Sequence, residues 1–448
     1  MIRHFILVAV LAWVLSPAGA SAQAPPTASV PLSLDRAVQD ALAQNASLRA
    51  AQSDAEAAGE TVTATRSAQF PRLSFTESWQ RGDQPVFVFS SLLSSRRFAA
   101  SNFAIDALNH PDPVGYFHGV AAVEQLVYDG GASGASTERA RAQKKIADLA
   151  TTEATLALVA NVTEMYGRLL VVEAAGRAST AALEAGREDL VSATRRRDAG
   201  TATEADVLSL TVHVADMEQR VIQAEGDTTV LRAQLNRLTG APVDRAFRVV
   251  EPAATVVTQV PELPALLAEA ESHRPEIQRA AVAEEIADTA RRTARSAYVP
   301  RVAAQAALDL SGNTFADRAS SWLVGGELRW SIGVGGAEHA QMKVAAASMT
   351  KARAEAEDAR AQVQVDVVTA LQQVQSARSR QAVGRAAVAQ ARESERIIRD
   401  RFDAGLAPVN DVLRAATAVL DADTQRVSAL VDALNGAAHL DRAIGRLP

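Results

Sequence analysis

The chain has 448 residues, of which 48% are hydrophobic, 22% charged and only 4% aromatic, and its formal net charge is −6. The hydrophobic fraction excludes wholesale disorder, and the mildly acidic balance, with basic residues scattered along the chain, argues against a nucleic-acid surface. Cysteine is absent, which excludes disulfides, thiolate metal sites, a cysteine nucleophile and a lipid anchor on an N-terminal cysteine.

The N-terminal 22 residues have the features of a secretory signal peptide. Arg3 is followed by the apolar run Phe5–Leu15, and Ala20-Ser21-Ala22 forms an A-x-A cleavage site. We therefore expect residues 1–22 to be removed and the mature chain to begin near Gln23. Because no later run of about 18 apolar residues stands out, we expect any membrane-spanning segment to be a β-strand.

The remaining sequence contains a tandem duplication of one large unit. Residues 34–71 match residues 263–300 at a constant offset of 229, and DAGTATEADVL at 198–208 matches DAGLAPVNDVL at 403–413 at an offset of 205. The offsets differ by 24, so the first unit carries 24 extra residues, which fall within residues 84–118. The expected organisation is a first unit, a linker and a second unit, at residues 23–240, 241–262 and 263–448.

Each unit is predicted to contain a helix, two strands, a very long helix and a shorter helix. The first helix, at residues 32–69, ends before Pro71, because the residue before a proline disfavours helical geometry. The long helices lack proline and are rich in Ala and Val. Their length of about 100 Å exceeds what globular domains hold, and their composition is typical of coiled-coil packing. The long and short helices are predicted at residues 132–197 and 204–238, and again at 337–403 and 408–444.

Four segments alternate between apolar and polar residues as β-strands do. The clearest places Trp322, Leu328 and Trp330 on an apolar face, and its length of about 12 residues fits a tilted membrane strand. A half-buried hairpin in water would alternate in the same way, but the signal peptide and the aromatic ends favour the membrane. The four strands are predicted at residues 71–80, 117–128, 300–310 and 321–332.

Four such strands cannot close a barrel by themselves. An open sheet edge in lipid would leave backbone groups unpaired, which is strongly unfavourable, and the smallest membrane barrels have about eight strands. If the strands span a membrane, the barrel must therefore be shared between subunits, with eight strands from two protomers or twelve from three.

With these features the chain resembles the TolC-like outer-membrane efflux proteins over nearly all of its mature length. The resemblance rests on the duplicated unit, on Pro71 and Pro300, on the Gly-Gly pairs at 130–131 and 335–336, and on the two AG-x5-DVL turns. It implies a mainly α fold with transmembrane β-structure. In that fold a homotrimer builds a twelve-stranded β-barrel in the outer membrane, which continues into a long periplasmic α-helical barrel.

The resemblance also implies a function and partners. Such proteins are the outer-membrane exit ducts of tripartite efflux or type I secretion systems in Gram-negative bacteria. They work with a periplasmic adaptor, also called a membrane fusion protein, and with an inner-membrane pump of the RND, ABC or MFS type. The alternative is a soluble periplasmic coiled-coil adaptor or scaffold of an export complex, which would not need lipid-facing residues around Trp322 and Trp330.

The resemblance places the periplasmic tip at the turns between the long and the short helices. Members of the family are engaged there by adaptor hairpins, so Gly200, Thr201, Gly405 and Leu406 are the candidate docking residues. The alternative is that these residues only form tight turns between antiparallel helices, in which glycine supplies a positive φ.

Asp411 matches the first acidic position of the family's constricted tunnel entrance, and Asp206 is its counterpart in the first unit. In a trimer, Asp411 would form a ring of carboxylates that favours cations. The second acidic position is occupied by Arg414, which can neutralise the ring or pair with Asp411. Phe402 and Ala407 stand where some members have polar gate-locking side chains. Alternatively, both aspartates are acids that interact with a helix N-terminus.

The 24 extra residues belong to a phenylalanine-rich segment that the family topology places outside the cell. Exposed apolar patches usually indicate contact, so we expect this segment to fold over or into the barrel mouth and to bury its aromatic side chains. These side chains are Phe87, Phe89, Phe98 and Phe103.

The sequence indicates neither an enzyme nor a cofactor or metal site. The histidines of the mature chain form no H-x-H or H-E-x-x-H pair, and no cysteine accompanies them. The Gly-Gly pair at 130–131 lacks the Gly-Lys-Ser/Thr ending of a phosphate-binding loop. We therefore expect no catalytic residues, no cofactor, no metal and no nucleic-acid partner.

Overall fold

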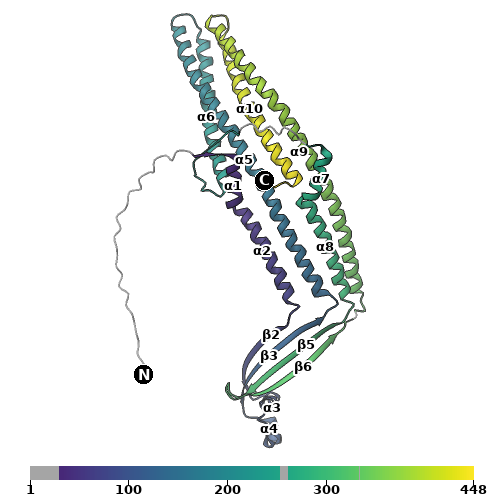
Figure 1. The fold of residues 1–448 in the computed structure, drawn as a ribbon. Coiled ribbons are helices and arrows are strands. Elements are labelled where there is room, and N and C mark those ends of the chain that lie inside the picture. Colours follow the sequence, from purple (N-terminus) through teal and green to yellow (C-terminus); the bar gives the residue numbers. More distant parts are fainter. Residues whose placement is uncertain (1–29, 253–260, 332, 448) are drawn as a thin grey trace, which may run out of the picture.

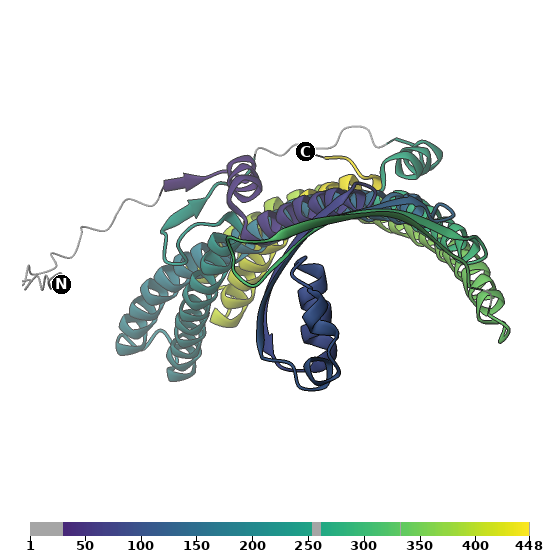
Figure 2. The same cartoon turned by 90° about the horizontal axis from the view of Figure 1, so that it is seen from below.

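The computed structural model of the protein describes residues 30–252, 261–331 and 333–447. The expected signal peptide and part of the expected linker lie outside these residues. Long helices form a wall that continues at one end into a four-stranded sheet (Figure 1). Viewed from below, the wall is an arc with a convex and a concave side (Figure 2).

Both halves of the chain contribute the same order of elements, and the first half has an insertion. The first half consists of α1 (Leu34–Gln44), α2 (Ala46–Ser67), β2 (Arg72–Gly82), β3 (Val114–Tyr128), α5 (Ala132–Asp198) and α6 (Glu204–Thr239). The second consists of α7 (Leu263–His273), α8 (Pro275–Ser296), β5 (Arg301–Gly312), β6 (Ala319–Arg329), α9 (Ala337–Asp403) and α10 (Val409–Ile444). Two short strands pair in parallel, β1 (Val30–Leu32) and β4 (Phe247–Val249). The insertion holds α3 (Pro85–Ser94), a 3-10 turn (Ala100–Phe103) and α4 (Ile105–Asn109).

The four long strands form one antiparallel sheet in the order β2-β3-β5-β6. β2 and β6 are its edge strands, and within the described residues neither has a partner on its outer side. At the end of the sheet nearest the helices, the pairing of β5 with β6 stops at Arg301 and Arg329. Pro300 has no backbone N–H with which to extend it. Trp330, which we expected within the strand, therefore follows it, and residue 332 lies outside the described residues.

The first helix of the chain is broken at Asn45, which corrects the expectation of one helix over residues 32–69. Asn45 leaves the helical conformation with a ψ of 125°, and its side-chain oxygen accepts Leu48 N–H at 3.0 Å. Its amide donates to Leu238 O at 2.9 Å. Asn45 therefore ends α1, caps α2 and ties the break to the end of α6. Leu32 lies outside the helix because it pairs with β4.

The second half has the equivalent break at Arg274, directly before Pro275 begins α8. The buried Arg274 guanidinium donates to Arg442 O at 2.9 Å and pairs with Asp366 at 2.9 Å and with Glu276 at 2.8 Å. Like Asn45 in the first half, Arg274 donates to a carbonyl near the C-terminal end of the shorter helix. The two halves therefore stabilise the same break with different side chains.

Tyr166 attaches the β1–β4 pair to the long helix α5. Its hydroxyl lies 2.9 Å from Leu32 O and 2.6 Å from Val250 O, and it accepts Val250 N–H at 2.9 Å. Burial raises the pKa of Tyr166 above its ordinary value, so the phenol remains a donor. Val162 and Leu169, on the same helix, pack beside Tyr166 in a buried apolar core.

α5 contains an 18-residue stretch that is apolar enough to cross a membrane, which the sequence expectation overlooked. Half of that stretch is buried inside the protomer, and α5 supplies Leu158, Val162 and Leu169 to the core around Tyr166. The core helix of a soluble protein can have the same composition, so packing within the protomer explains the apolar stretch.

We expect Tyr166→Phe to lower the free energy of unfolding by about 1 kcal/mol, because it removes the hydrogen bonds of the hydroxyl to Leu32 and Val250, while the backbone bond from Val250 N–H to Leu32 O remains. The urea-induced loss of the helical circular dichroism signal measures this change. Tyr128→Phe is the control, because the side chain of Tyr128 is half exposed and makes no hydrogen bond within the described residues. Equal unfolding midpoints for the two variants would contradict the role of Tyr166.

Candidate functional site

Both turns between the long and the shorter helices are tight. Gly200 and Gly405 have φ values of 77° and 74°, a left-handed conformation that strains other residues. In the first turn, the backbone N–H and the hydroxyl of Thr201 both donate to Arg196 O, at 2.8 and 3.0 Å. In the second turn, Leu406 N–H closes the loop at 2.8 Å, and the Leu406 side chain is 78% exposed. The two turns lie at one end of the molecule (Figure 1). The first turn presents a hydroxyl group, and the second presents an exposed apolar side chain.

The two aspartates expected near the tunnel entrance have different surroundings. The Asp206 carboxylate accepts Thr203 N–H at 3.0 Å, and the Thr203 hydroxyl accepts Asp206 N–H at 3.2 Å, which forms a capping box at the start of α6. Asp411 forms no such box, because Pro408 occupies the cap position of α10. The Asp411 carboxylate lies instead 3.7 Å from Arg414. The structure therefore pairs Asp411 with Arg414 and uses Asp206 in a helix cap.

Arg196 connects the two helical hairpins near their tips, and sequence reasoning missed this residue. The Arg196 guanidinium carbon lies 5.2 Å from the centroid of the Phe402 ring, and one guanidinium nitrogen lies 3.3 Å from the Asp403 carboxylate. Arg196 belongs to α5 and both partners belong to α9. A cation–π contact and an ion pair thus join the two hairpins at this position. No spacing in the sequence pairs α5 with α9, so only the packing reveals the contact.

A second ion pair joins the same two helices farther from the tips. Arg399 on α9 lies 3.7 Å from Asp189 on α5. Burial raises the pKa of Asp189 above its ordinary value, and the nearby Arg399 partly offsets this effect. On the neighbouring α6, burial lowers the pKa of His213. The contact between α5 and α9 is therefore partly shielded from water, which strengthens its electrostatic interactions.

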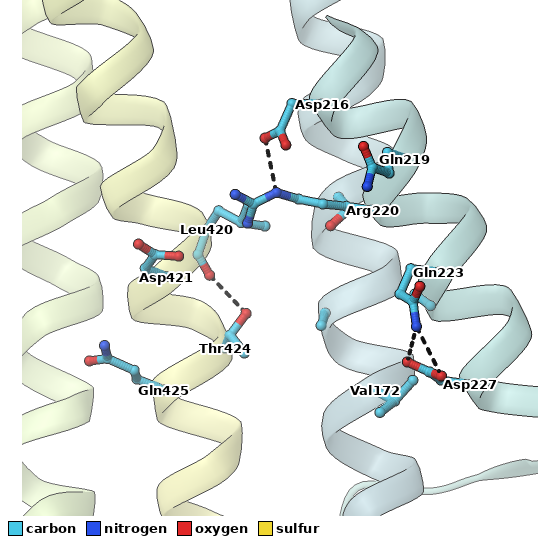
Figure 3. A pocket seen from close by; sticks show the side chains of 13 residues that line it. Val172, Asp216, Gln219, Arg220, Gln223, Asp227, Leu420, Asp421, Thr424 and Gln425 are labelled. Atoms are coloured by element: carbon cyan, nitrogen blue, oxygen red, sulfur yellow. Dashed lines mark hydrogen bonds and ion pairs between the residues drawn. The ribbon is translucent and has the colours of Figure 1, made fainter. Parts of the chain in front are cut away.

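A groove of about 450 Å³ lies between α10 and the α5–α6 hairpin (Figure 3). Asp216 pairs there with Arg220 at 3.0 Å, and Asp227 accepts a hydrogen bond from Gln223 at 3.2 Å. Asp421, on the facing helix, is the repeat counterpart of Asp216. The groove has no histidine to activate a hydroxyl. Within the described residues, no cluster of His, Asp and Glu could hold a metal ion.

One face of the sheet exposes large apolar side chains. Residues directly opposite each other on paired strands share a face, and the register aligns Phe75, Ala121, Leu308 and Trp322 in one row across all four strands. Trp322 is 77% exposed, and Leu328 lies on the same face. Trp330, beyond the end of β6, and Trp79 of β2 are exposed as well. The lipid-facing candidates on the strands thus lie on one largely apolar face, which also carries the ion pair of Glu77 with Arg318 at 2.9 Å.

The opposite face of the sheet is polar and carries α3. The Tyr116 hydroxyl lies 2.9 Å from Ser311 Oγ, and His118 Nε2 lies 3.1 Å from the Asp309 carboxylate. Phe87 of α3 packs edge-on against Tyr116, with ring centroids 6.1 Å apart. Because α3 lies on the concave side of the sheet (Figure 2), the polar face is the concave one and the apolar face is the convex one.

The phenylalanines of the extra segment are only partly covered in the protomer, and their burial at the barrel mouth of an assembly stays a prediction. Phe89, Phe98 and Phe103 form a chain of edge-to-face contacts, with centroids 4.6 and 5.0 Å apart. Phe103 is nevertheless 64% exposed, and Phe87, Phe89 and Phe98 are half-buried. Within the described residues, the helix α3 of this segment packs against β3, β5 and α4.

A comparison with protein families agrees with this geometry. Residues 37–241 and 266–446 match the family model described as outer membrane efflux protein. The two matched stretches correspond to the two halves of the duplicated fold. Among curated proteins, no sequence matches this chain at a significant level.

Solved structures share the fold over 92% of this chain. A membrane protein from Pseudomonas aeruginosa is 20% identical, with 90% of its length covered and a TM-score of 0.78. The outer membrane protein VceC from Vibrio cholerae is 19% identical, with 96% covered and a TM-score of 0.75. The CmeC outer membrane channel of Campylobacter jejuni is 16% identical, with 85% covered and a TM-score of 0.78. These likenesses establish the fold, and the family match, which spans most of the sequence, establishes that the chain belongs to the outer membrane efflux protein family.

Proposed function

We propose that this protein is the outer-membrane exit duct of a tripartite efflux or type I secretion system in a Gram-negative bacterium, and that it acts as a homotrimer. The observation that carries the proposal is a sheet with an apolar convex face, a polar concave face and two unpaired edges. In the assembled duct, the convex face contacts lipid and the concave face lines an aqueous passage. Structures named as outer-membrane proteins or channels have the same fold.

Closing the sheet requires the β2 edge of one copy to pair with the β6 edge of the next. Unpaired backbone groups in lipid are strongly unfavourable, and contact between unlike edges closes a ring when the rotation between copies permits it. Three copies of the four-stranded sheet make a barrel of twelve strands. β2 and β6 have 11 residues each, which is long enough to cross a bilayer as tilted strands.

The helical wall also has lateral edges that can meet in the assembly. Leu208, Val212 and Ile222 are exposed on α6, and Val344 and Val383 are exposed on α9. These two helices lie toward opposite ends of the arc in Figure 2. We propose that the α6 edge of one protomer packs against the α9 edge of the next. This contact would close the periplasmic tunnel around the same threefold axis as the barrel.

At the periplasmic end, the proposal assigns adaptor docking to the two tight turns. The Thr201 hydroxyl offers a polar contact, and the exposed Leu406 side chain offers an apolar one. Gly200 and Gly405 allow the tight turns and add no side chain to them. The docked adaptor would connect the duct to an inner-membrane pump. Such a pump would be of the RND, ABC or MFS type, and it would deliver the cargo.

The tunnel entrance is assigned to the region around Asp411. Three copies of its carboxylate would surround the axis, each with Arg414 at 3.7 Å, so the ring would favour cations less than a ring of aspartates alone. Asp206 contributes its charge to the cap of α6. The contact of Arg196 with Phe402 would hold the two hairpins of each protomer together in the closed state.

Cell fractionation tests the proposed location and assembly together. We expect a Gram-negative host that expresses the full precursor to place the mature chain in its outer membrane. After extraction in detergent, native mass spectrometry should give three times the protomer mass. A soluble periplasmic species would overturn the duct and support the alternative, a coiled-coil adaptor or scaffold of an export complex with a water-facing sheet.

Two adjacent residues of β6 distinguish the lipid-facing side from the lumenal side. We expect Val324→Arg, on the convex face, to destabilise the inserted protein by about 2–4 kcal/mol if it lies near the bilayer centre. Leu323→Arg, on the concave face, is the matched control and should be tolerated, because its charge would face water. The amount of assembled trimer in the outer membrane measures both effects. An equal loss in the two variants would argue against the assignment of the convex face to lipid.

The link between the hairpins predicts a gating phenotype. Arg196→Ala removes contacts worth about 1 kcal/mol at this half-exposed site, which corresponds to a roughly fivefold larger open fraction. Single-channel recording in planar bilayers should therefore show more frequent or longer openings. Arg195→Ala is the control, because this neighbouring side chain is exposed and has no ion pair within the described residues. Identical recordings from both variants would show that Arg196 does not restrain the entrance.

A further inference from the structure

The extra segment between β2 and β3 is attached to the concave face of the sheet at both ends of α3. Phe87 packs against β3, and Val88 and Ser91 are buried on the side of α3 that contacts β3 and β5. After α3, the Arg96 guanidinium donates to Ser320 O on β6 at 2.8 Å. The segment therefore reaches from β3 to β6, which is the far edge strand of the sheet. Figure 2 shows the segment inside the arc.

The backbone at Arg96 supports a fixed position for α3. Arg96 has a φ of 52°, and within the described residues no other non-glycine residue has a positive φ. Its N–H donates to Leu93 O at 3.1 Å and the next N–H donates to Leu92 O at 2.9 Å, which ends the helix. Glycine usually occupies such a position. Arginine accepts the backbone strain there and supplies the side chain that reaches Ser320.

The side of α3 that points away from the sheet is exposed. At about 3.6 residues per turn, Val86 and Leu93 lie nearly opposite the buried Val88 and Ser91. Val86 is 82% exposed and Leu93 is 57% exposed. Ser90 lies between them on the same stripe, and its hydroxyl is already bonded to Phe87 O at 3.1 Å. The stripe is therefore largely apolar, and it faces the space that the sheet encloses.

We infer that Val86 and Leu93 of each subunit pack against the same residues of the other copies at the axis and form an apolar constriction at the outer mouth. The inference rests on the proposed trimeric duct. A second copy of the chain is the occupant that the placement favours, because the stripe lies on the concave side, where bilayer lipid and a periplasmic adaptor have no access. A ring of apolar side chains resists hydrated ions by dewetting, so this constriction would limit ion leakage while apolar or amphipathic cargo passes.

The absence of cysteine from the chain makes a cross-linking test direct. We expect Leu93→Cys and Val86→Cys proteins in isolated outer membranes to form disulfide-linked dimers on mild oxidation, because a disulfide requires Cβ atoms about 4 Å apart. Three thiols around one axis can form only one disulfide, so the product is a dimer accompanied by one unlinked chain. Val324→Cys, on the convex face, is the control and should remain monomeric on denaturing gels.

Conductance measures the functional consequence. Leu93→Ser keeps the helix attached to the sheet and replaces the apolar group, so we expect a higher open-channel conductance to potassium chloride than in the parent protein. Deletion of residues 86–109 removes the whole constriction and should raise the conductance further. Unchanged conductance in both variants would overturn the inference.

Native mass in detergent separates this inference from the proposed duct. A trimer in which neither cysteine variant forms dimers would overturn the constriction and leave the duct intact. A protein that is not trimeric would overturn the duct itself. Dimers from the convex control as well would show collision between separate assemblies, and would count against a contact at the axis.

Discussion

Backbone hydrogen bonding at the edges of the β2-β3-β5-β6 sheet is the constraint on which the rest of the structure depends. The convex face of this sheet exposes large apolar side chains, and if that face contacts lipid as proposed, the backbone groups of the two edge strands have to be paired. In the proposed assembly both requirements are met at once, since copies of the chain pair edge to edge. The helical wall curves in the same sense as the sheet that it continues (Figure 2), which is compatible with a closed ring in the proposed assembly.

The middle of the molecule keeps the long helices in register with that sheet. Asn45 and Arg274 interrupt the first helix of each half and bond to the end of the shorter helix. Tyr166 joins α5 to the short β1–β4 pair by the hydrogen bonds of its hydroxyl. These polar contacts fix where each hairpin leaves the body of the protein, and so they position the tips about half a long helix away.

Periodicity, proline placement and internal repetition were enough to predict the long helices, the strand order along the chain and the family. The family-model match over both halves confirms the family. Other features depend on contacts that a single sequence does not display. Asn45 has ordinary helix-compatible neighbours, so its break becomes visible only with its partner Leu238. Arg196 and Phe402 are far apart in the chain and follow no shared period. The segment around Phe87 was expected to bury its aromatic side chains, yet Phe103 is 64% exposed in the protomer.

The insertion in the first half has a consequence for symmetry. A duplicated chain in three copies would give a ring with six nearly equivalent sectors, and a feature present in both halves would occur six times around the axis. α3 occurs in one half only, so the ring loses this approximate sixfold repetition at its outer end and keeps only the exact threefold one. In the proposed trimer, the short connection between β5 and β6 leaves three sectors of the outer end to the bulky element and three to a plain hairpin.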